Sequence, residues 1–112
     1  MNQNPLVQTG KTLLSIQSVD NVNKEILLIT QEECAEVSQA ISKVFRFGLT
    51  ESHPITKINN QAHLEEEIGD LLCMIQLMME YKIIDKDACE AARLQKLNKL
   101  IKWSTIFKEE TE

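Results

Sequence analysis

The sequence has little of what tight turns require: its 112 residues include only three glycines and two prolines. An all-β sandwich or barrel depends on many turns, so this composition disfavours such folds and suits long helices. Aromatic residues are also scarce, at 4% of the chain. The apolar fraction of 43% is nevertheless ordinary for a globular protein and disfavours wholesale disorder, and the length allows one small domain.

Three further features are missing: an excess of positive charge, a long apolar run and an N-terminal targeting pattern. The net charge of −5 disfavours nucleic acid as the main partner, because a phosphate backbone attracts strongly basic surfaces. No apolar stretch approaches the ~18 residues that a membrane span needs. The opening MNQNPLVQTGK lacks the basic start and apolar run of a signal peptide. We therefore expect a cytoplasmic protein that binds neither nucleic acid nor membrane.

The cysteines do not form a recognisable pattern either. Cys34, Cys73 and Cys89 are odd in number, widely spaced and without a C-x-x-C pair. Each lies in an apparently helical segment, so we expect reduced, buried thiols and no disulfide framework.

What the sequence does contain is helical periodicity in three segments. The first covers residues 21–47 and is followed by Gly48, a residue typical of helix C-termini. The second runs from about residue 61 to 82, and the third from an N-cap at Asp85 to about residue 103. Apolar residues recur on one face of each segment. Short connections between such helices predict an all-α, antiparallel helical bundle.

Nothing divides the chain into more than one domain, so we expect a single helical domain over residues 1–112. Within it, residues 1–20 are only weakly patterned, and the acidic segment 105–112 is expected to fray at its end. The loop at residues 48–60 contains Pro54, which interrupts helices, and one of its two final asparagines is a plausible N-cap for the second helix.

Four carboxylates fall inside or beside the apolar stripes of the first two helices. Glu33 lies in the middle of the first stripe, and Glu36 follows three residues later on the same side. Glu67 lies within the second stripe, with Asp70 at its edge. Because an unpaired carboxylate on a core-facing surface is costly, two such pairs aimed inward from adjacent helices require a shared positive charge.

A hard divalent cation with oxygen ligands supplies that charge directly. A set of carboxylates without histidine or cysteine indicates Mg²⁺ and phosphate chemistry rather than zinc or copper chemistry. The alternative reading is that EECAE and HLEEEIGD are solvated acidic helix faces, as charge runs usually are. Glu65 and Glu66 point away from the stripe and fit that description.

The two acidic motifs carry a family resemblance. EECAEVSQAISKVFRFG followed by LEEEIGDLLCMIQLM resembles the all-α nucleotide pyrophosphohydrolases of the MazG-like family, which are related to the dimeric dUTPases. The resemblance covers roughly residues 24–104. It implies an Mg²⁺-dependent hydrolase, with Mn²⁺ as the alternative metal, that converts a nucleoside triphosphate and water to the monophosphate and pyrophosphate. It also implies a homodimer or homotetramer.

The resemblance assigns roles to particular residues. It implies that the metal ligands are Glu33, Glu36, Glu67 and Asp70. Glu32 and Glu33 would be the catalytic residues. Glu32 would orient or deprotonate the attacking water, or it would only contact residues that surround the metal ligands. Phosphate-binding candidates come from LQKLNKLIKW and from the end of the first helix: Lys96, Asn98, Lys99, Lys102 and Arg46. The base would lie in an apolar cleft. Trp103, Tyr81 or Phe47 would either stack on the base there or pack in the core of the protein.

One departure from the family pattern concerns the loop. Thirty residues separate Glu36 from Glu67, longer than is usual for the family, so the 48–60 loop is an elaboration that either covers the nucleotide or mediates assembly.

Two other functions compete with the enzyme. A di-iron carboxylate bundle also projects glutamates inward, but it needs Glu-x-x-His motifs, and neither His53 nor His63 follows a glutamate at that spacing. His63 does lie four residues before Glu67, within reach on a helix. The other rival is a non-enzymatic helical interaction or regulatory protein whose acidic face docks on a basic partner.

Overall fold

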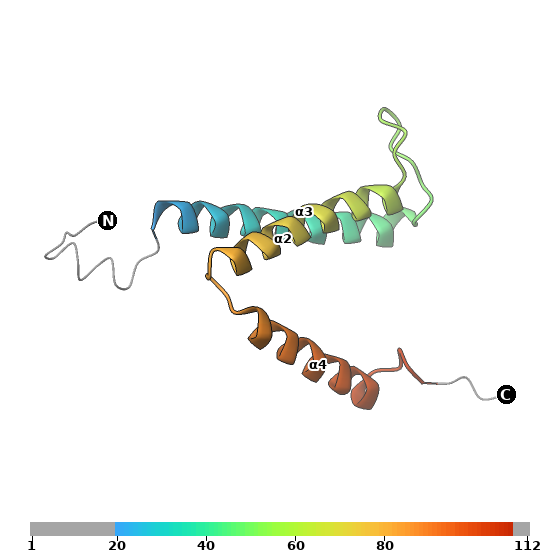
Figure 1. The fold of residues 1–112 in the computed structure, drawn as a ribbon. Helices are drawn as coiled ribbons and strands as arrows, with labels where there is room; N and C mark the ends of the chain where they lie inside the picture. Colours follow the sequence, from blue (N-terminus) through green and yellow to red (C-terminus); the bar gives the residue numbers. More distant parts are fainter. Residues whose placement is uncertain (1–19, 109–112) are drawn as a thin grey trace, which may run out of the picture.

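The computed structural model describes residues 20–108 and contains three helices within that range (Figure 1). They are α2 (Asn21–Phe47), α3 (Asn60–Glu80) and α4 (Lys86–Trp103). The described part of the chain has no β-strand beyond one isolated bridge. The all-α prediction is therefore confirmed, with helix bounds within two residues of those expected. The 1–20 segment, apart from Asp20, and the end of the acidic tail lie outside the described residues.

Each helix begins where the sequence provides a side-chain cap. An aspartate or asparagine immediately before the helix accepts a hydrogen bond of 2.8 Å from a backbone N–H in the first turn, which would otherwise lack a partner. The pairs are Asp20 with Asn23, Asn59 with Ala62, and Asp85 with Ala88. Of the two asparagines that the sequence offered as the N-cap of α3, the structure uses Asn59.

The helix ends are set by backbone conformation. Gly48 has a φ of 87° and its N–H donates to the Val44 carbonyl, so the residue that stops α2 is the one that adopts positive φ without a Cβ penalty. At the end of α3, Lys82 adopts a φ of 61°, and the chain turns there toward α4. The helix consequently stops at Glu80 rather than at Lys82, where the periodicity placed its end.

The loop between α2 and α3 is a hydrogen-bonded hairpin rather than an irregular connection. Ser52 and Asn59 form an isolated antiparallel bridge, and the His53 N–H donates to the Ile58 carbonyl at 2.9 Å. Lys57, with a φ of 66°, donates to the His53 carbonyl and closes the tip. Figure 1 shows this hairpin projecting from the end of the α2–α3 pair. Its backbone pairing gives it a defined shape.

The core lies between α2 and α3, which run antiparallel and side by side (Figure 1). Its buried apolar residues are Ile26, Val37 and Ala40 of α2 and Met74 of α3. Ala40 is fully buried, and its small side chain allows the two helices to approach closely. Ile41 and Phe47, two further apolar residues of α2, are exposed.

Helix α4 leaves the end of α3 and points away from the α2–α3 pair (Figure 1). It contains no buried residue, so its apolar stripe covers nothing within the described chain. Leu94 is 47% exposed and Ile101 is 54% exposed. Within residues 20–108 the packed part of the bundle is thus the α2–α3 pair, with α4 as a third helix that this chain alone does not cover. No described helix is long and apolar enough to cross a membrane.

The cysteines also differ from expectation. All three are unpaired thiols, as predicted, but Cys34 and Cys73 are exposed and Cys89 is half-buried. The prediction that they are buried was wrong, because a pair of helices with one side uncovered leaves much of each helix surface open to solvent.

Candidate metal centre

Three of the four predicted carboxylates converge at one place between α2 and α3. Glu33 comes from α2, and Glu67 and Asp70 come from α3, where they lie three residues apart and therefore on the same face. One carboxylate oxygen from each lies within 4.8 Å of the others. The antiparallel packing around Ala40 and Met74 holds the two helix faces at this separation. The structure therefore brings both acidic motifs together.

The electrostatics of the group match the expectation of crowded negative charge. The pKa of the Glu33 carboxyl is raised, first because partial burial removes it from water, and then because Asp70, Glu67, Glu36 and Glu32 place negative charge around it. No lysine or arginine forms an ion pair with these carboxylates within residues 20–108. The repulsion is therefore left without a lysine or arginine to relieve it.

Glu36 does not join the group. It is exposed, and it is absent from the set of ligand atoms that lie within 4.8 Å of one another. Its charge still contributes to the raised pKa of Glu33, which places it in the neighbourhood. Glu32 is likewise exposed and contributes in the same way. Glu65 and Glu66 are exposed, as predicted for solvated positions.

The expectation that these carboxylates are aimed into the core was wrong. Glu33 and Glu67 are half-buried, Asp70 is exposed, and no charged residue is buried among the residues that the structure describes. The reason is architectural: α4, which periodicity alone would pack against the pair, points away and leaves the carboxylate face open to solvent. The group is unusual because like charges lie close together and Glu33 among them is also partly withdrawn from water.

His63 lies beside the group. Its Nε2 atom is 3.7 Å from an Oε2 atom of Glu67, one helical turn along α3. The side chains of His63 and Glu67 are 30% and 14% exposed, so this contact is more sheltered than a typical surface pair. The four-residue spacing indicated the contact, but the sequence alone did not distinguish it from a surface histidine.

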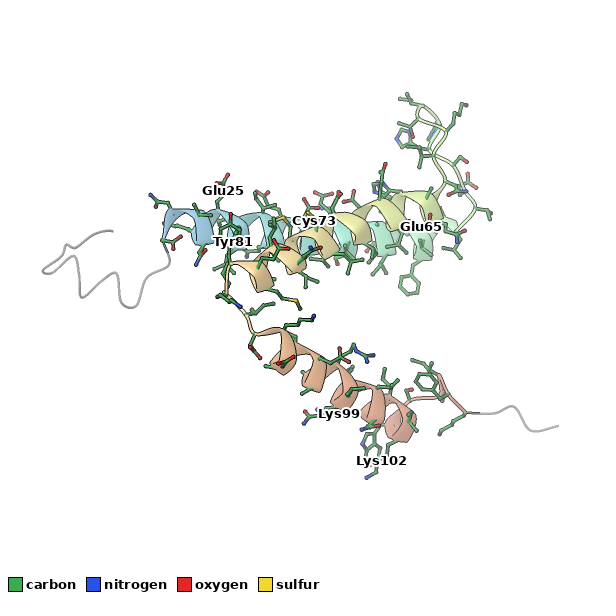
Figure 2. The ribbon with its side chains drawn as sticks, in the orientation of Figure 1. Glu25, Glu65, Cys73, Tyr81, Lys99 and Lys102 are labelled. Carbon is green, nitrogen blue, oxygen red and sulfur yellow. The ribbon has the colours of Figure 1, made fainter. Side chains whose placement is uncertain are left out.

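The predicted phosphate-binding residues lie elsewhere. Lys96, Asn98, Lys99 and Lys102 are all exposed on α4. Figure 2 shows Lys99 and Lys102 on this helix, apart from the α2–α3 pair. The Lys102 ammonium lies 5.3 Å from the centre of the Trp103 ring, and Arg46 lies at the same distance from the Phe47 ring. Within the described chain, α4 therefore brings no cation to the carboxylates.

The aromatic candidates for base stacking are not core residues. Trp103 is 77% exposed, and Tyr81 and Phe47 are about half exposed. Phe47 lines a cavity together with residues of the 48–60 loop.

The geometry of the three carboxylates suits a hard cation. Mg²⁺ binds oxygen ligands octahedrally at about 2.1 Å, so neighbouring ligands stand roughly 3.0 Å apart and opposite ligands roughly 4.2 Å apart. Oxygens that already lie within 4.8 Å of one another reach these separations through side-chain movements of about 2 Å or less. The group contains no histidine and no cysteine, which disfavours zinc and a di-iron centre. The arrangement can hold a divalent cation that shares its coordination with phosphate oxygens.

Comparison with known protein families identifies a domain in this chain. The family profile for the MazG nucleotide pyrophosphohydrolase domain matches residues 21–102, a range that includes all three described helices, both acidic motifs and the loop between them. No curated protein and no solved structure matches the chain significantly. Because the profile covers most of the 112 residues, this chain belongs to the MazG nucleotide pyrophosphohydrolase family.

Proposed function

We propose that the protein is an Mg²⁺-dependent nucleoside triphosphate pyrophosphohydrolase that converts a ribo- or deoxyribonucleoside triphosphate and water to the monophosphate and pyrophosphate. The observation that carries the proposal is the convergence of Glu33, Glu67 and Asp70 within 4.8 Å, without a lysine or arginine paired to the group among residues 20–108. Membership of a nucleotide pyrophosphohydrolase family supports the same reaction class.

In this proposal Glu33, Glu67 and Asp70 hold the cation, and Glu36 completes the set. Glu36 lies one turn along α2 from Glu33 and is exposed, so a change of side-chain rotamer brings it toward the group. When bound, Mg²⁺, or Mn²⁺ in its place, offsets the charge of the phosphate oxygens and lowers the pKa of water.

The chain itself supplies position and a proton acceptor. Water attacks phosphorus, the α–β anhydride bond breaks, and pyrophosphate leaves with the bonding electron pair. The proton released by the water passes to a carboxylate. We assign this role to Glu32 or Glu33, which are adjacent on α2 at the edge of the group. The proposed ligands and the proton acceptor then all lie on α2 and α3, so their mutual geometry depends on the packing of these two helices.

The phosphates need positive charge that the α2–α3 pair does not provide. Lys96, Lys99 and Lys102, with Asn98 between them, are exposed on α4, and Arg46 is exposed near the end of α2. The exposed apolar residues of α4 support assembly into a homodimer or homotetramer, in which the α4 of a second copy faces the carboxylates. In this proposal the active site lies at an interface between copies.

A screen of nucleotides tests the reaction. The purified protein is incubated with each ribo- and deoxyribonucleoside triphosphate in the presence of Mg²⁺, and the products are separated by ion-exchange chromatography. The expected products are the monophosphate and pyrophosphate in equal amounts, with no orthophosphate. An Asp70→Asn variant purified in the same way should be inactive, which excludes a contaminating phosphatase. If no nucleotide is hydrolysed, the enzyme proposal fails and a helical interaction protein becomes the better explanation.

A further inference from the structure

A cavity of about 430 Å³ lies at the end of the α2–α3 pair and is lined on one side by the hairpin of residues 48–59. Its walls come from all three of these segments: Lys43 and Phe47 of α2, His53, Pro54 and Ile58 of the hairpin, and His63 of α3. Its volume is within the range of about 300–1,000 Å³ that is usual for small-molecule sites.

The hairpin side of the cavity is held in a defined conformation. The His53 ring accepts hydrogen bonds at Nδ1 from the backbone N–H groups of Ile55 and Thr56, at 3.1 and 3.3 Å. In the neutral ring the proton therefore sits on Nε2, which leaves a hydrogen-bond donor on a residue that lines the cavity. The Asn60 side chain donates to the Gly48 carbonyl at 2.9 Å and ties the base of the hairpin to the end of α2.

His63 connects this cavity to the carboxylates. It lines the cavity, and its Nε2 atom is 3.7 Å from Glu67. Along α3 the two residues are one turn apart, about 6 Å of helix rise. Because α2 runs antiparallel to α3, the same direction along α2 leads from Glu36 to Lys43 and Phe47. The cavity is thus the next space beyond the carboxylates toward the hairpin.

The composition of the walls distinguishes between the two ends of a nucleoside triphosphate. Phe47, Pro54 and Ile58 provide apolar surface, which suits a base and sugar. Lys43 and Glu51 both line the cavity, so with neutral histidines its formal charge is zero. Pyrophosphate carries several negative charges and requires a surplus of positive charge that these walls do not have.

We propose that this cavity binds the nucleoside end of the substrate and that the hairpin determines which base is accepted. The proposal rests on the proposed function, because it requires the phosphate chain to lie at Glu33, Glu67 and Asp70. The α-phosphate is joined to the base only through the sugar, so the base must lie close to the carboxylates, and the cavity shares His63 with their surroundings. The phosphates beyond the scissile bond then extend away from the hairpin.

The test fills the cavity without touching the carboxylates. Ile58→Trp places a large side chain in the wall, whereas Ile55→Trp is the matched control, since Ile55 lies on the same hairpin, is 83% exposed and does not line the cavity. For the best substrate of the nucleotide screen, we expect Ile58→Trp to raise KM at least tenfold, with a smaller effect on kcat. Ile55→Trp should leave both constants unchanged.

Calorimetric titration identifies which end of the substrate the cavity holds. Ile58→Trp should weaken binding of the matching nucleoside monophosphate about tenfold and leave binding of inorganic pyrophosphate, measured with Mg²⁺, within twofold of the original protein. Loss of pyrophosphate binding instead would mean that the cavity holds the leaving group and would overturn the proposal. Unchanged monophosphate binding would also overturn it.

A second pair of variants covers the case in which Ile58→Trp does not fold. Phe47→Ala removes an apolar wall at a position that is 56% exposed, and Phe45→Ala is its control, at a position that is 87% exposed and outside the cavity. The same shift in monophosphate binding is expected for Phe47→Ala alone. If the original protein hydrolyses no nucleotide, the proposed function fails, but the monophosphate titration still decides whether the cavity binds a nucleoside.

Discussion

The α2–α3 pair and α4 come from the same chain, are equally helical and begin with the same kind of cap, yet only the pair has a core. Asn59 caps α3 and Asp85 caps α4 with hydrogen bonds of equal length. All of the buried apolar residues of the described chain nevertheless lie on α2 and α3, and α4 has none. Local sequence therefore determines where a helix forms, whereas burial depends on whether a second apolar surface is available.

The same comparison separates two kinds of charge. The carboxylates that converge lie on the packed pair, where helix packing fixes their distances. The lysines proposed to bind phosphate lie on α4, where nothing in the described chain fixes their position. In our proposal the first group forms within one chain and the second becomes useful only when another copy is present.

The largest expected effect comes from removing a carboxylate of the packed pair. Glu67→Gln should lower kcat/KM by more than about 100-fold, because it removes a proposed metal ligand. Lys99→Ala should lower it by about tenfold, mainly through KM, because it removes one charged contact to phosphate. Steady-state kinetics on both variants with the same nucleotide measures the difference. Equal losses in the two variants would contradict this division of roles.

The next prediction concerns the uncovered face of α4. Ile101→Glu replaces an apolar side chain that is 54% exposed in the single chain, and it should convert the proposed dimer or tetramer to monomers because a charge at a buried interface is strongly unfavourable. Light scattering over a range of protein concentrations measures the change. Gln95→Glu is the control, since it adds the same charge to an exposed α4 position without removing apolar surface. A monomeric original protein would refute the assembly proposal.

Much of this structure was predictable from local patterns, and the failures share one cause. The caps at Asn59 and Asp85, the stop at Gly48 and the pairing of the two acidic motifs follow from residue types and helical spacing. The exposure of the carboxylates and of the cysteines could not be predicted in this way, because exposure depends on which other element covers a helix face. The cavity was missed for a related reason: it is formed by the hairpin of residues 48–59, whose shape is set by backbone pairing that periodicity does not reveal.

A smaller effect is expected from removing the charge of Glu33, which is partly withdrawn from water and lies among other carboxylates. The raised pKa means that the folded protein holds the Glu33 proton more tightly than the unfolded chain does, so ionisation of Glu33 destabilises the metal-free protein. This penalty is present at neutral pH, and it disappears as the pH falls below the pKa that Glu33 has in the unfolded chain. Glu33→Gln should therefore raise the melting temperature of the metal-free protein at pH 8 but not at pH 4.

Addition of Mg²⁺ should make the melting temperature of the original protein higher than that of Glu33→Gln. The cation stabilises the original protein by binding only its folded state, whereas Glu33→Gln should lose most of that stabilisation. Thermal unfolding with and without Mg²⁺ measures both effects, and Glu65→Gln, at an exposed position outside the carboxylate group, serves as the control. A variant that gains no stability without metal and still responds fully to Mg²⁺ would show that Glu33 is only a solvated surface residue.

The smallest expected effect comes from removing the helix N-caps Asn59 and Asp85, which make equivalent hydrogen bonds. Asn59→Ala and Asp85→Ala each remove one side-chain hydrogen bond of 2.8 Å from the first turn of a helix, and in a packed helix such a loss costs about 1 kcal/mol. In the assembled protein both helices are covered in our proposal, so urea denaturation at equal protein concentration should give similar losses of about 1 kcal/mol.

The monomeric Ile101→Glu background should separate the two caps. There, α3 remains packed against α2, so Asn59→Ala still lowers the free energy of unfolding by about 1 kcal/mol. Helix α4 is then uncovered, so Asp85→Ala should leave global unfolding unchanged and reduce only the helical circular dichroism signal, because an unpacked helix of 18 residues frays without affecting the core. An equal loss for both caps in the monomer would mean that α4 packs onto α2 and α3 of its own chain. The carboxylates would then be covered from within, and the second copy would no longer be needed to complete the site.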